Sequence, residues 1–303
     1  MDDNEPHPLL DEAIQDFQLR YKPYDIQIGF MNDMLKCYDE EQIGFFESPT
    51  GTGKSSSVIC SSIAYLRNKN SMFFNKKKRY NSSDSDASNS DSSDIDFDDD
   101  LFDENKPKPS KLIISTRTHS QIKEMVSEFK NLLHSAQKKR SEAKQQVINL
   151  EVKMKAGQKN LLNEIQENQQ QVTSLTHYID TFPRCVSLAS RKQLCVNSEF
   201  KNLSQSEISE KCNSKCPYYN NGDFKQFRKT IRDNPMDIED LCRYGESYQL
   251  CPYYASRDSI SHSDVILLPY QTLFQPSARE NIELKLTNSY IVVDEAHNLV
   301  DAL

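Results

Sequence analysis

The amino-acid sequence predicts an α/β protein with a parallel sheet. Short, continuous apolar runs stand at residues 43–46, 112–114, 265–268 and 291–293. Runs of this kind suit strands that are covered on both faces. Helical patterns lie between the runs, and this alternation is typical of a parallel sheet with helices packed on it. A loop with two glycines directly follows the first run.

This loop, Glu-Ser-Pro-Thr-Gly-Thr-Gly-Lys-Ser at residues 47–55, precedes a helical pattern at residues 56–66. Glycines between a strand and a helix let backbone N–H groups wrap phosphates. Lys54 would reach the β and γ phosphates, and Ser55 would bind Mg2+. Ser48 stands where the usual phosphate loop has its first glycine. The predicted ATP-binding residues of the loop are Ser48, Pro49, Thr50, Gly51, Thr52, Gly53, Lys54 and Ser55.

An acidic insert is expected at residues 75–110. Ten Asp and Glu residues and no Lys or Arg lie between residues 82 and 104. Such a tract repels itself and buries no core, so we expect it to be disordered. The low mean hydropathy of the chain, -0.74, also indicates that part of its length is unfolded. The chain has a net charge of -8, and without this tract it has +2, so its charge does not exclude a nucleic-acid partner.

A helical insert is expected at residues 135–180, which are rich in Lys, Glu and Gln. Its apolar residues recur at mostly helical spacing. They are Val147, Leu150, Met154, Leu161, Ile165, Val172 and Leu175. Gly157 and Asn168 interrupt the seven-residue repeat, so a helical hairpin is favoured over a coiled coil.

The cysteines indicate a metal site rather than a set of disulfides. Eight cysteines in 303 residues are too few for a disulfide scaffold. Cys195, Cys212, Cys216 and Cys251 are separated by 16, 3 and 34 residues. This spacing permits either a zinc ion or an iron-sulfur cluster. The four other cysteines, which are expected to be structural thiols, are Cys37, Cys60, Cys185 and Cys242.

The last apolar run ends in Asp294 and Glu295. In a protein with a phosphate loop, one acid at this position holds Mg2+ and its neighbour orients the attacking water. We therefore expect Asp294 to bind Mg2+ and Glu295 to activate water, with Lys54 as the third catalytic residue. Without the phosphate loop, the two acids would be interpreted as a solvated strand end.

Four segments together resemble a known family. Asp-Glu-Ala-His at residues 294–297 and Thr-Gly-Thr-Gly-Lys-Ser at residues 50–55 resemble the DEAH-type helicases of the second helicase superfamily. Residues 115–121 are similar to motif Ia of that superfamily, and residues 187–195 to the start of an iron-sulfur domain. The chain is thus identified as a member of the xeroderma pigmentosum group D family of DNA helicases. It most resembles the chromosome-loss (Warsaw breakage syndrome) helicase branch at residues 46–49, 216–220 and 268–271.

The resemblance implies a RecA-like motor lobe with a mainly helical iron-sulfur domain inserted into it. The expected segments are an N-terminal tail (1–22), the first part of the motor lobe (23–74), the acidic insert (75–110), the lobe with motif Ia (111–134), the helical insert (135–180), a strand of the lobe (181–190), the iron-sulfur domain (191–259) and the end of the lobe (260–303).

The resemblance also implies roles for single residues. Cys195, Cys212, Cys216 and Cys251 would hold a 4Fe-4S cluster. Gln27 would lie on the adenine side of ATP, and His297 would couple the nucleotide to DNA. The residues expected to contact the DNA backbone are Arg117, Thr118, His119, Ser120, Arg191 and Lys192.

By resemblance, the chain is part of a nuclear DNA helicase that uses ATP and Mg2+ to move 5′ to 3′ along single-stranded DNA, in DNA repair and sister chromatid cohesion. Its expected partners are ATP, single-stranded or forked DNA, and chromatin or replication proteins. No apolar run reaches the roughly 18 residues of a membrane span, so no membrane partner is expected.

Family members continue beyond the DEAH segment with further domains, so we expect an incomplete motor that unwinds little alone. Two other functions fit the residues. One is binding of ATP and single-stranded DNA without turnover, and the other is a zinc-stabilised interaction module.

Overall fold

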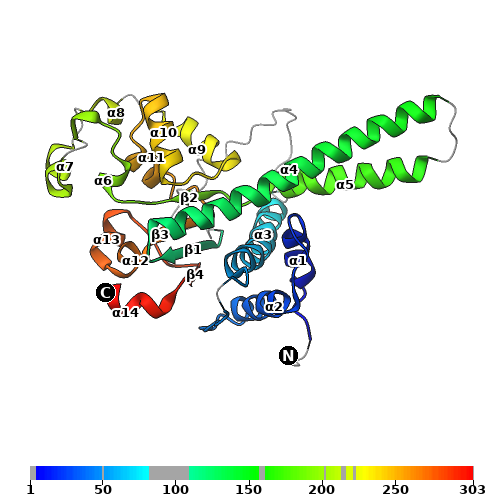
Figure 1. The fold of residues 1–303 in the computed structure, drawn as a ribbon, viewed down its shortest axis with the longest axis horizontal. Helices are drawn as coiled ribbons and strands as arrows, with labels where there is room; N and C mark the ends of the chain where they lie inside the picture. Colours follow the sequence, from blue (N-terminus) through cyan, green and yellow to red (C-terminus); the bar gives the residue numbers. More distant parts are fainter. Residues whose placement is uncertain are drawn as a thin grey trace. The chain divides into compact units, whose positions relative to one another are not determined.

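The computed structural model describes residues 5–49, 51–81, 109–156, 161–200, 203–212, 216–220 and 223–302. The chain forms two compact units, each made of two segments. Unit 1 consists of Met1–Arg67 and Glu128–Phe182, and unit 2 of Asn68–Ser127 and Pro183–Leu303. Figure 1 shows their elements coloured along the sequence.

Unit 1 is helical. Its core includes Met31, Leu35, Ile59, Ile63, Phe129 and Leu132, all 2% exposed or less. Its helices are α1 (Leu10–Gln18), α2 (Asp25–Asp39), the first part of α3 (Lys54–Asn81), the later part of α4 (His119–Lys155) and α5 (Leu162–Asp180).

Unit 2 contains the sheet, in which all neighbouring strands are parallel. The strands are β1 (Lys111–Thr116), β2 (Cys185–Ser187), β3 (Val265–Pro269) and β4 (Ser289–Val293), in the order β2-β3-β1-β4. Ile113 of β1 is paired with Ile266 of β3 and Ile291 of β4. The predicted α/β class with a parallel sheet is confirmed, and the apolar runs at residues 112–114, 265–268 and 291–293 lie in three of its strands.

The run at residues 43–46 was predicted to be a strand, and this prediction is wrong. Residues 42–49 have no regular secondary structure, and Ile43 and Phe45 are 88% and 93% exposed. A strand needs a neighbour to satisfy its backbone groups. No described strand pairs with this run. Its one ring contact among the described residues joins Phe46 to Phe30 of α2, with centroids 5.4 Å apart.

Short helices follow β2 and bury one face against the sheet. Four of them begin at a residue whose side chain accepts a hydrogen bond from the first turn, which stabilises a helix start; these residues are Ser190, Ser204, Asp223 and Asp237. The helices are α6 (Arg191–Leu194), η2 (Ser198–Phe200), α7 (Gln205–Lys211), α8 (Pro217–Asn220), α9 (Phe224–Asp233), α10 (Ile238–Tyr248) and α11 (Pro252–Asp258). The expected helical character of residues 191–259 is thus present.

The core of unit 2 joins these helices to the sheet. Phe227 of α9, Leu241 of α10 and Ala255 of α11 belong to one buried cluster with Val186 and Ile266 of the strands. The remaining helices follow β3 and β4 in the sequence. They are α12 (Tyr270–Phe274), α13 (Pro276–Asn281), η3 (Ala296–Asn298) and α14 (Leu299–Ala302).

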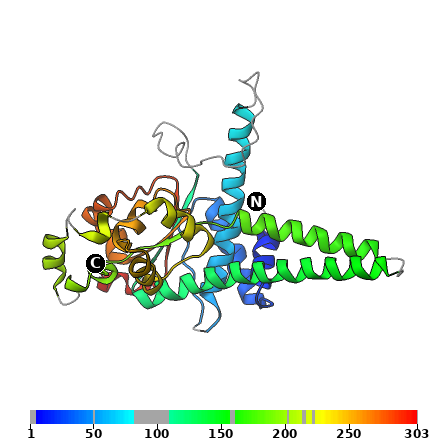
Figure 2. The same ribbon diagram turned by 90° about the horizontal axis from the view of Figure 1, so that it is seen from above.

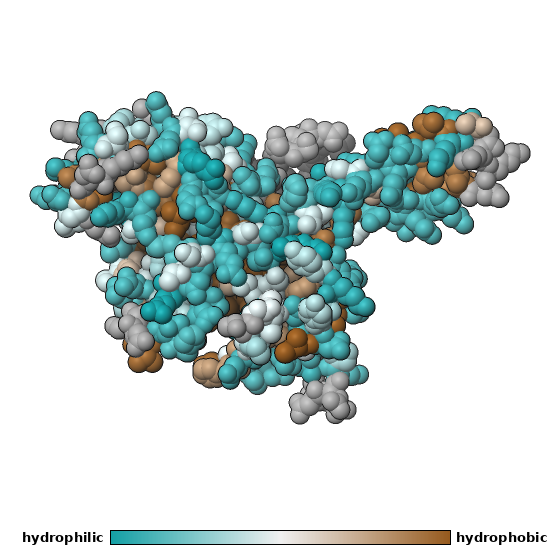
Figure 3. Space-filling view, in the orientation of Figure 1, coloured by the Kyte–Doolittle hydropathy of each residue, from teal (hydrophilic) through white to brown (hydrophobic). Residues whose placement is uncertain are grey.

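Helices α4 and α5 form the predicted hairpin, and they lie side by side in Figures 1 and 2. However, α4 begins at His119, so motif Ia and the insert share one continuous helix rather than meeting at residue 135. Residues 119–155 contain no Gly or Pro that would end it. Brown apolar surface marks the far part of the hairpin in Figure 3, where Ile148, Val152 and Leu162 are more than half exposed.

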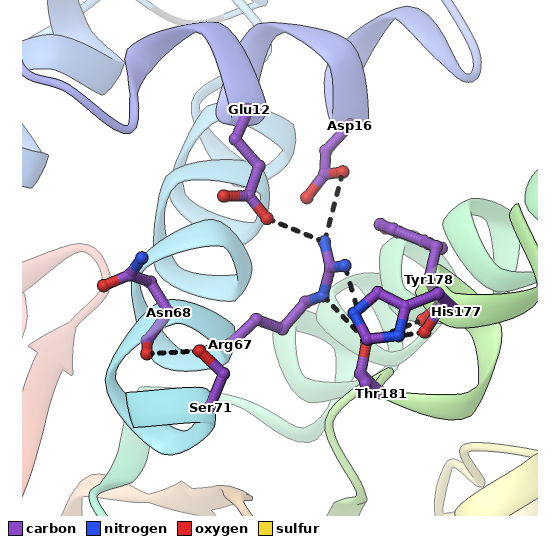
Figure 4. Close-up of polar contacts among 8 residues, drawn as sticks. All are labelled: Glu12, Asp16, Arg67, Asn68, Ser71, His177, Tyr178 and Thr181. Carbon is purple, nitrogen blue, oxygen red and sulfur yellow. Dashed lines mark hydrogen bonds and ion pairs between the residues drawn. The ribbon is translucent and has the colours of Figure 1, made fainter. Parts of the chain in front are cut away.

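An arginine holds three helices of unit 1 together near the base of the hairpin (Figure 4). Arg67 of α3 lies 3.1 Å from Glu12 and 3.9 Å from Asp16 of α1. Its guanidinium stands 4.3 Å from the ring centroid of Tyr178 of α5 and donates to the Thr181 hydroxyl at 3.4 Å. We call Glu12, Asp16, Arg67, Tyr178 and Thr181 the Arg67 clamp.

The acidic tract at residues 82–104 lies outside the described residues, so its expected disorder stays a prediction. Helix α3 continues to Asn81, so residues 75–81 of the expected acidic insert are helical. Among the described residues, no helix is long and apolar enough to cross a membrane.

Candidate nucleotide site and cysteine pocket

The glycine loop lies in unit 1, just before α3. Gly51 and Gly53 have positive φ angles of 80° and 72°. Residues with a Cβ disfavour this conformation, so both positions favour glycine. A Cβ at Gly53 would also lie 2.6 Å from Gln27 Nε2. Thr50, also expected to bind ATP, lies outside the described residues.

Lys54 is the first residue of α3, and its ammonium donates to the Ser48 carbonyl at 2.7 Å. The Thr52 hydroxyl donates to the Pro49 carbonyl at 2.8 Å and lies 2.5 Å from the Ser48 hydroxyl. These hydrogen bonds lie within the loop and stabilise its conformation. They hold the Lys54 charge beside the N-terminus of a long helix, where anions are favoured. Ser55, the expected Mg2+ ligand, is the next residue of the same helix.

Gln27 connects the loop to α2. The side chain is buried and accepts a hydrogen bond from the Tyr24 N–H at 2.8 Å. It donates in turn to the Thr52 carbonyl at 2.8 Å. The structure therefore brings Gln27 into contact with the loop from which it is separated by more than 20 residues. Its position beside adenine stays a prediction.

Asp294 directly follows β4 in unit 2. Its backbone N–H donates to the Ser115 carbonyl at 2.9 Å, which places Asp294 at the carboxyl end of the sheet. The Tyr270 hydroxyl donates to the Asp294 carbonyl. Burial, and then the charges of Asp294 and Glu295, raise the pKa of Tyr270 to about 12, so this hydroxyl stays protonated. Tyr270 was not predicted as a site residue, although it lies in one of the segments that carry the family resemblance.

A series of polar contacts runs from Glu295 to motif Ia. His297 Nδ1 lies 3.3 Å from Glu295 Oε2, and His297 Nε2 lies 2.9 Å from Asn298 Nδ2. Arg117 donates to Asn298 Oδ1 at 2.8 Å. Glu295 itself has a positive φ of 53°, which is uncommon for a residue with a side chain. No sequence pattern pointed to Asn298, because only the fold brings it to Arg117.

Motif Ia forms the turn from β1 into α4. The Thr118 N–H and hydroxyl both bond to Gln121 Oε1, at 2.9 and 3.1 Å, and this fixes the first turn of the helix. Arg117, Thr118 and Ser120 are exposed, so they are accessible to a phosphate backbone. His119 differs from them: its Nδ1 is buried without a hydrogen-bond partner, and burial lowers its pKa.

Four cysteines of unit 2 line one pocket. Cys195 and Cys212 follow α6 and α7, and Cys216 and Cys251 precede α8 and α11. The fold thus gathers the four cysteines that the sequence singled out. The other residues that line the pocket are Arg191, Val196, Asn197, Phe200, Tyr218 and Tyr253.

The pocket disfavours free thiolates. Burial raises the pKa of Cys195, and nearby Cys212 and Cys216 add to the shift. Burial also raises the pKa of Cys251 to about 11. A positive group is therefore needed to hold all four as thiolates. Two side chains make long polar contacts with the thiols: Asn197 Nδ2 lies 3.9 Å from Cys216 Sγ, and the Tyr254 hydroxyl lies 3.9 Å from Cys212 Sγ.

The four cysteines share a pocket without forming a tight group of ligands. A zinc ion draws its ligand sulfurs to about 2.3 Å from one point. Among the described residues, no three His, Cys, Asp or Glu side chains form a group that could hold a metal ion.

The other cysteines lie outside the pocket lining. Cys242 Sγ donates to the Gln193 carbonyl at 3.3 Å, and Cys37 Sγ to the Gln42 carbonyl at 3.2 Å. Cys60 and Cys185 are each 1% exposed. These environments agree with the expected structural thiols.

The two expected DNA contacts at the start of α6 differ in their surroundings. Lys192 is exposed. Arg191 lines the cysteine pocket, with its guanidinium 4.6 Å from the Tyr253 ring centroid and 5.7 Å from that of Tyr254. Lys192 is therefore the more accessible of the two to a nucleic-acid strand.

Comparison with known proteins identifies similar chains. The family model described as DEAD_2 matches residues 114–303. The chain is 31% identical to an ATP-dependent DNA helicase CHL1 of Yarrowia lipolytica, over 95% of this chain and 42% of the relative. It is 28% identical to the ATP-dependent DNA helicase chl1 of Schizosaccharomyces pombe, again over 95% of this chain and 42% of the relative.

A further relative, a regulator of telomere elongation helicase 1 homolog of Anopheles gambiae, is 29% identical over 92% of this chain and 25% of its own length. A solved structure titled XPD helicase covers 93% of this chain at 17% identity, with a TM-score of 0.49. The chain thus spans less than half the length of these relatives.

Proposed function

This chain belongs to the DEAD_2 family, and from this premise we propose that it is the ATP-binding portion of a DNA helicase. The family resemblance inferred from the motifs is confirmed by this match and by the two helicase relatives from yeasts. The observation that carries the proposal is the glycine loop, in which Gly51 and Gly53 have positive φ angles and Lys54 opens α3.

Each residue of the proposed ATP site has a distinct role. Lys54 would neutralise charge on the β and γ phosphates, which the loop would contact through its backbone N–H groups. Ser55 and Asp294 would supply oxygen ligands, which Mg2+ prefers. Glu295 would orient the water that attacks the γ phosphate. Gln27 would set the loop through its bond to Thr52.

The cysteine pocket is the proposed site of a 4Fe-4S cluster, with Cys195, Cys212, Cys216 and Cys251 as thiolate ligands. The support from the structure is that all four cysteines line one pocket. The choice of a cluster over zinc rests on the resemblance of the chain to the iron-sulfur helicases. When bound, the cluster would cross-link the short helices around the pocket. Iron and sulfide analysis tests this assignment, and stoichiometric zinc without iron would overturn it.

The proposed substrate is single-stranded or forked DNA, with 5′ to 3′ movement. Support comes from the exposed hydroxyls and guanidinium of motif Ia, a set that holds phosphates without reading sequence. The contact of Arg117 with Asn298 links this set to the residues beside Glu295. His297 would transmit the state of the nucleotide along this path. A nuclear location and chromatin or replication partners complete the proposal.

Hydrolysis of ATP with and without single-stranded DNA tests the function. We expect DNA to stimulate hydrolysis. Replacing the proposed catalytic carboxylate, E295Q, should reduce the rate by about a hundredfold while ATP still binds. The control E142Q changes an exposed carboxylate of the hairpin and should leave the rate unchanged. Binding of ATP and DNA without turnover by the wild type would favour the non-catalytic alternative.

A further inference from the structure

Arg257 is a largely buried cation of α11. Its guanidinium donates to the backbone carbonyls of Tyr253 and Ala189 at 3.0 and 3.3 Å. It also lies 3.3 Å from the Tyr253 ring centroid. Its Nε is buried without a hydrogen-bond partner. Among the described residues, no carboxylate forms an ion pair with it.

Such an environment is costly for a fixed charge, because burial weakens hydration and two carbonyls replace it only in part. Accordingly, burial lowers the pKa of Arg257 to about 10. The nearby carboxylate of α11, Asp258, is already paired with Arg228 at 2.5 Å. Among the described residues, Arg257 therefore has no carboxylate partner for its charge.

The cysteine pocket and Arg257 share one tyrosine. Tyr253 lies against Arg257 and also lines the pocket, where Arg191 contacts the same ring. Arg191 helps to lower the pKa of Arg257, because the two guanidinium groups repel each other. Arg191 and Arg257 both contact Tyr253, and four thiols belong to the lining of the same pocket. Two positive charges beside four thiols favour a bound group of net negative charge.

We propose that Arg257 is the counter-charge of the cysteine pocket, acting through Tyr253 to stabilise the negative charge of the bound cluster. It is a positioning residue, not a ligand. This inference rests on the proposed iron-sulfur site. A nearby fixed positive charge favours the more reduced and more negative cluster, because net charge and surroundings tune iron-sulfur potentials.

The test compares R257Q, R257K and the wild type as full chains purified without oxygen. R257Q removes the charge, whereas R257K keeps it. We expect R257Q to shift the midpoint potential of the cluster to more negative values and to release iron to a chelator roughly tenfold faster. R257K should retain the wild-type potential. R228Q is the matched control. It breaks the ion pair between Arg228 of α9 and Asp258 of α11, neither of which lines the pocket, and it should also retain the wild-type potential.

The outcomes separate the two proposals. A wild-type chain without iron would overturn the cluster itself. A loaded wild type and a loaded R257Q with equal potentials and iron release would overturn only the role of Arg257. Equal shifts in R257Q and R257K would also overturn it, since charge would then not be the cause. If R257Q does not fold, R257M replaces it as the variant without charge, and the same comparison with R257K decides.

Discussion

Gln27 shows at the scale of one residue how the nucleotide loop is held. Its amide spans the space between the start of α2 and the Thr52 carbonyl with two hydrogen bonds. It also occupies the space beside Gly53 that a Cβ would need. The loop conformation thus depends on a buried amide outside the loop.

Replacing this amide, Q27A, should weaken Mg-ATP binding about fivefold, because one hydrogen bond of about 1 kcal/mol is lost from the loop. The dissociation constant, measured by fluorescence with a labelled ATP analogue, checks this. Gln145 is an exposed glutamine of the hairpin, and Q145A is the matched control. Equal affinities of Q27A and wild type would contradict the proposed role of the bond.

Residue roles were predictable only where a motif carries them. The phosphate-loop residues and the four pocket cysteines follow from sequence patterns. Tyr270, Asn298 and Arg257 do not, because each acts through a neighbour that is distant in sequence. The role of Arg257 was also not predictable, because the sequence does not show how far an arginine is buried or whether it has an acidic partner.

At the scale of elements, the Arg67 clamp joins α1, α3 and α5. Asp16 is 3% exposed, and one of its oxygens is buried without a hydrogen-bond partner. Burial raises its pKa from 3.8 to about 8, although the Arg67 charge opposes the shift. The folded state therefore binds the Asp16 proton more tightly than the unfolded state does.

This shift makes stability depend on pH. The contribution of neutral Asp16 is complete below about pH 4 and is lost as the pH rises through about 8. We therefore expect the urea midpoint of the wild type to fall from pH 5 to pH 8.5, and that of D16N to fall less. E12Q removes a charge that adds to the raised pKa of Asp16, so the fall of its midpoint should lie between those of the wild type and D16N. The same fall in D16N as in the wild type would contradict this assignment.

The hairpin has a core-packed base and an exposed far part. Phe129 is fully buried and lies 6.2 Å from the Phe182 ring, whereas Val152 is 61% exposed. F129A should lower the free energy of unfolding by about 3–5 kcal/mol, since it leaves a cavity. V152A, on the same helix, should change it by less than about 0.5 kcal/mol. Denaturant titration compares them, and equal losses would contradict the packing described.

Apolar pattern predicted most of the elements. Three of four apolar runs are strands, because each pairs with a parallel neighbour. The run at residues 43–46 has the same composition but no described partner, and composition cannot supply one. The hairpin was predictable from its spacing. Its true start at His119 was not, since motif Ia was expected to end a separate segment.

At the scale of the whole molecule, the predicted functional groups divide between two compact units. The glycine loop belongs to unit 1, and the DEAH segment, motif Ia and the cysteine pocket belong to unit 2. The expected layout, in which one motor lobe contains both the glycine loop and the sheet, stays a prediction.

Binding of Mg-ATP to this chain tests the central claim most directly. The account predicts saturable, Mg2+-dependent binding by the wild type that K54A weakens at least tenfold, because a charged hydrogen bond to phosphate is worth about 1.5–3 kcal/mol. K138A, at an exposed lysine of α4, should bind like the wild type. Undetectable binding by the wild type, or equal affinities of wild type and folded K54A, would contradict the claim that this loop is an ATP site.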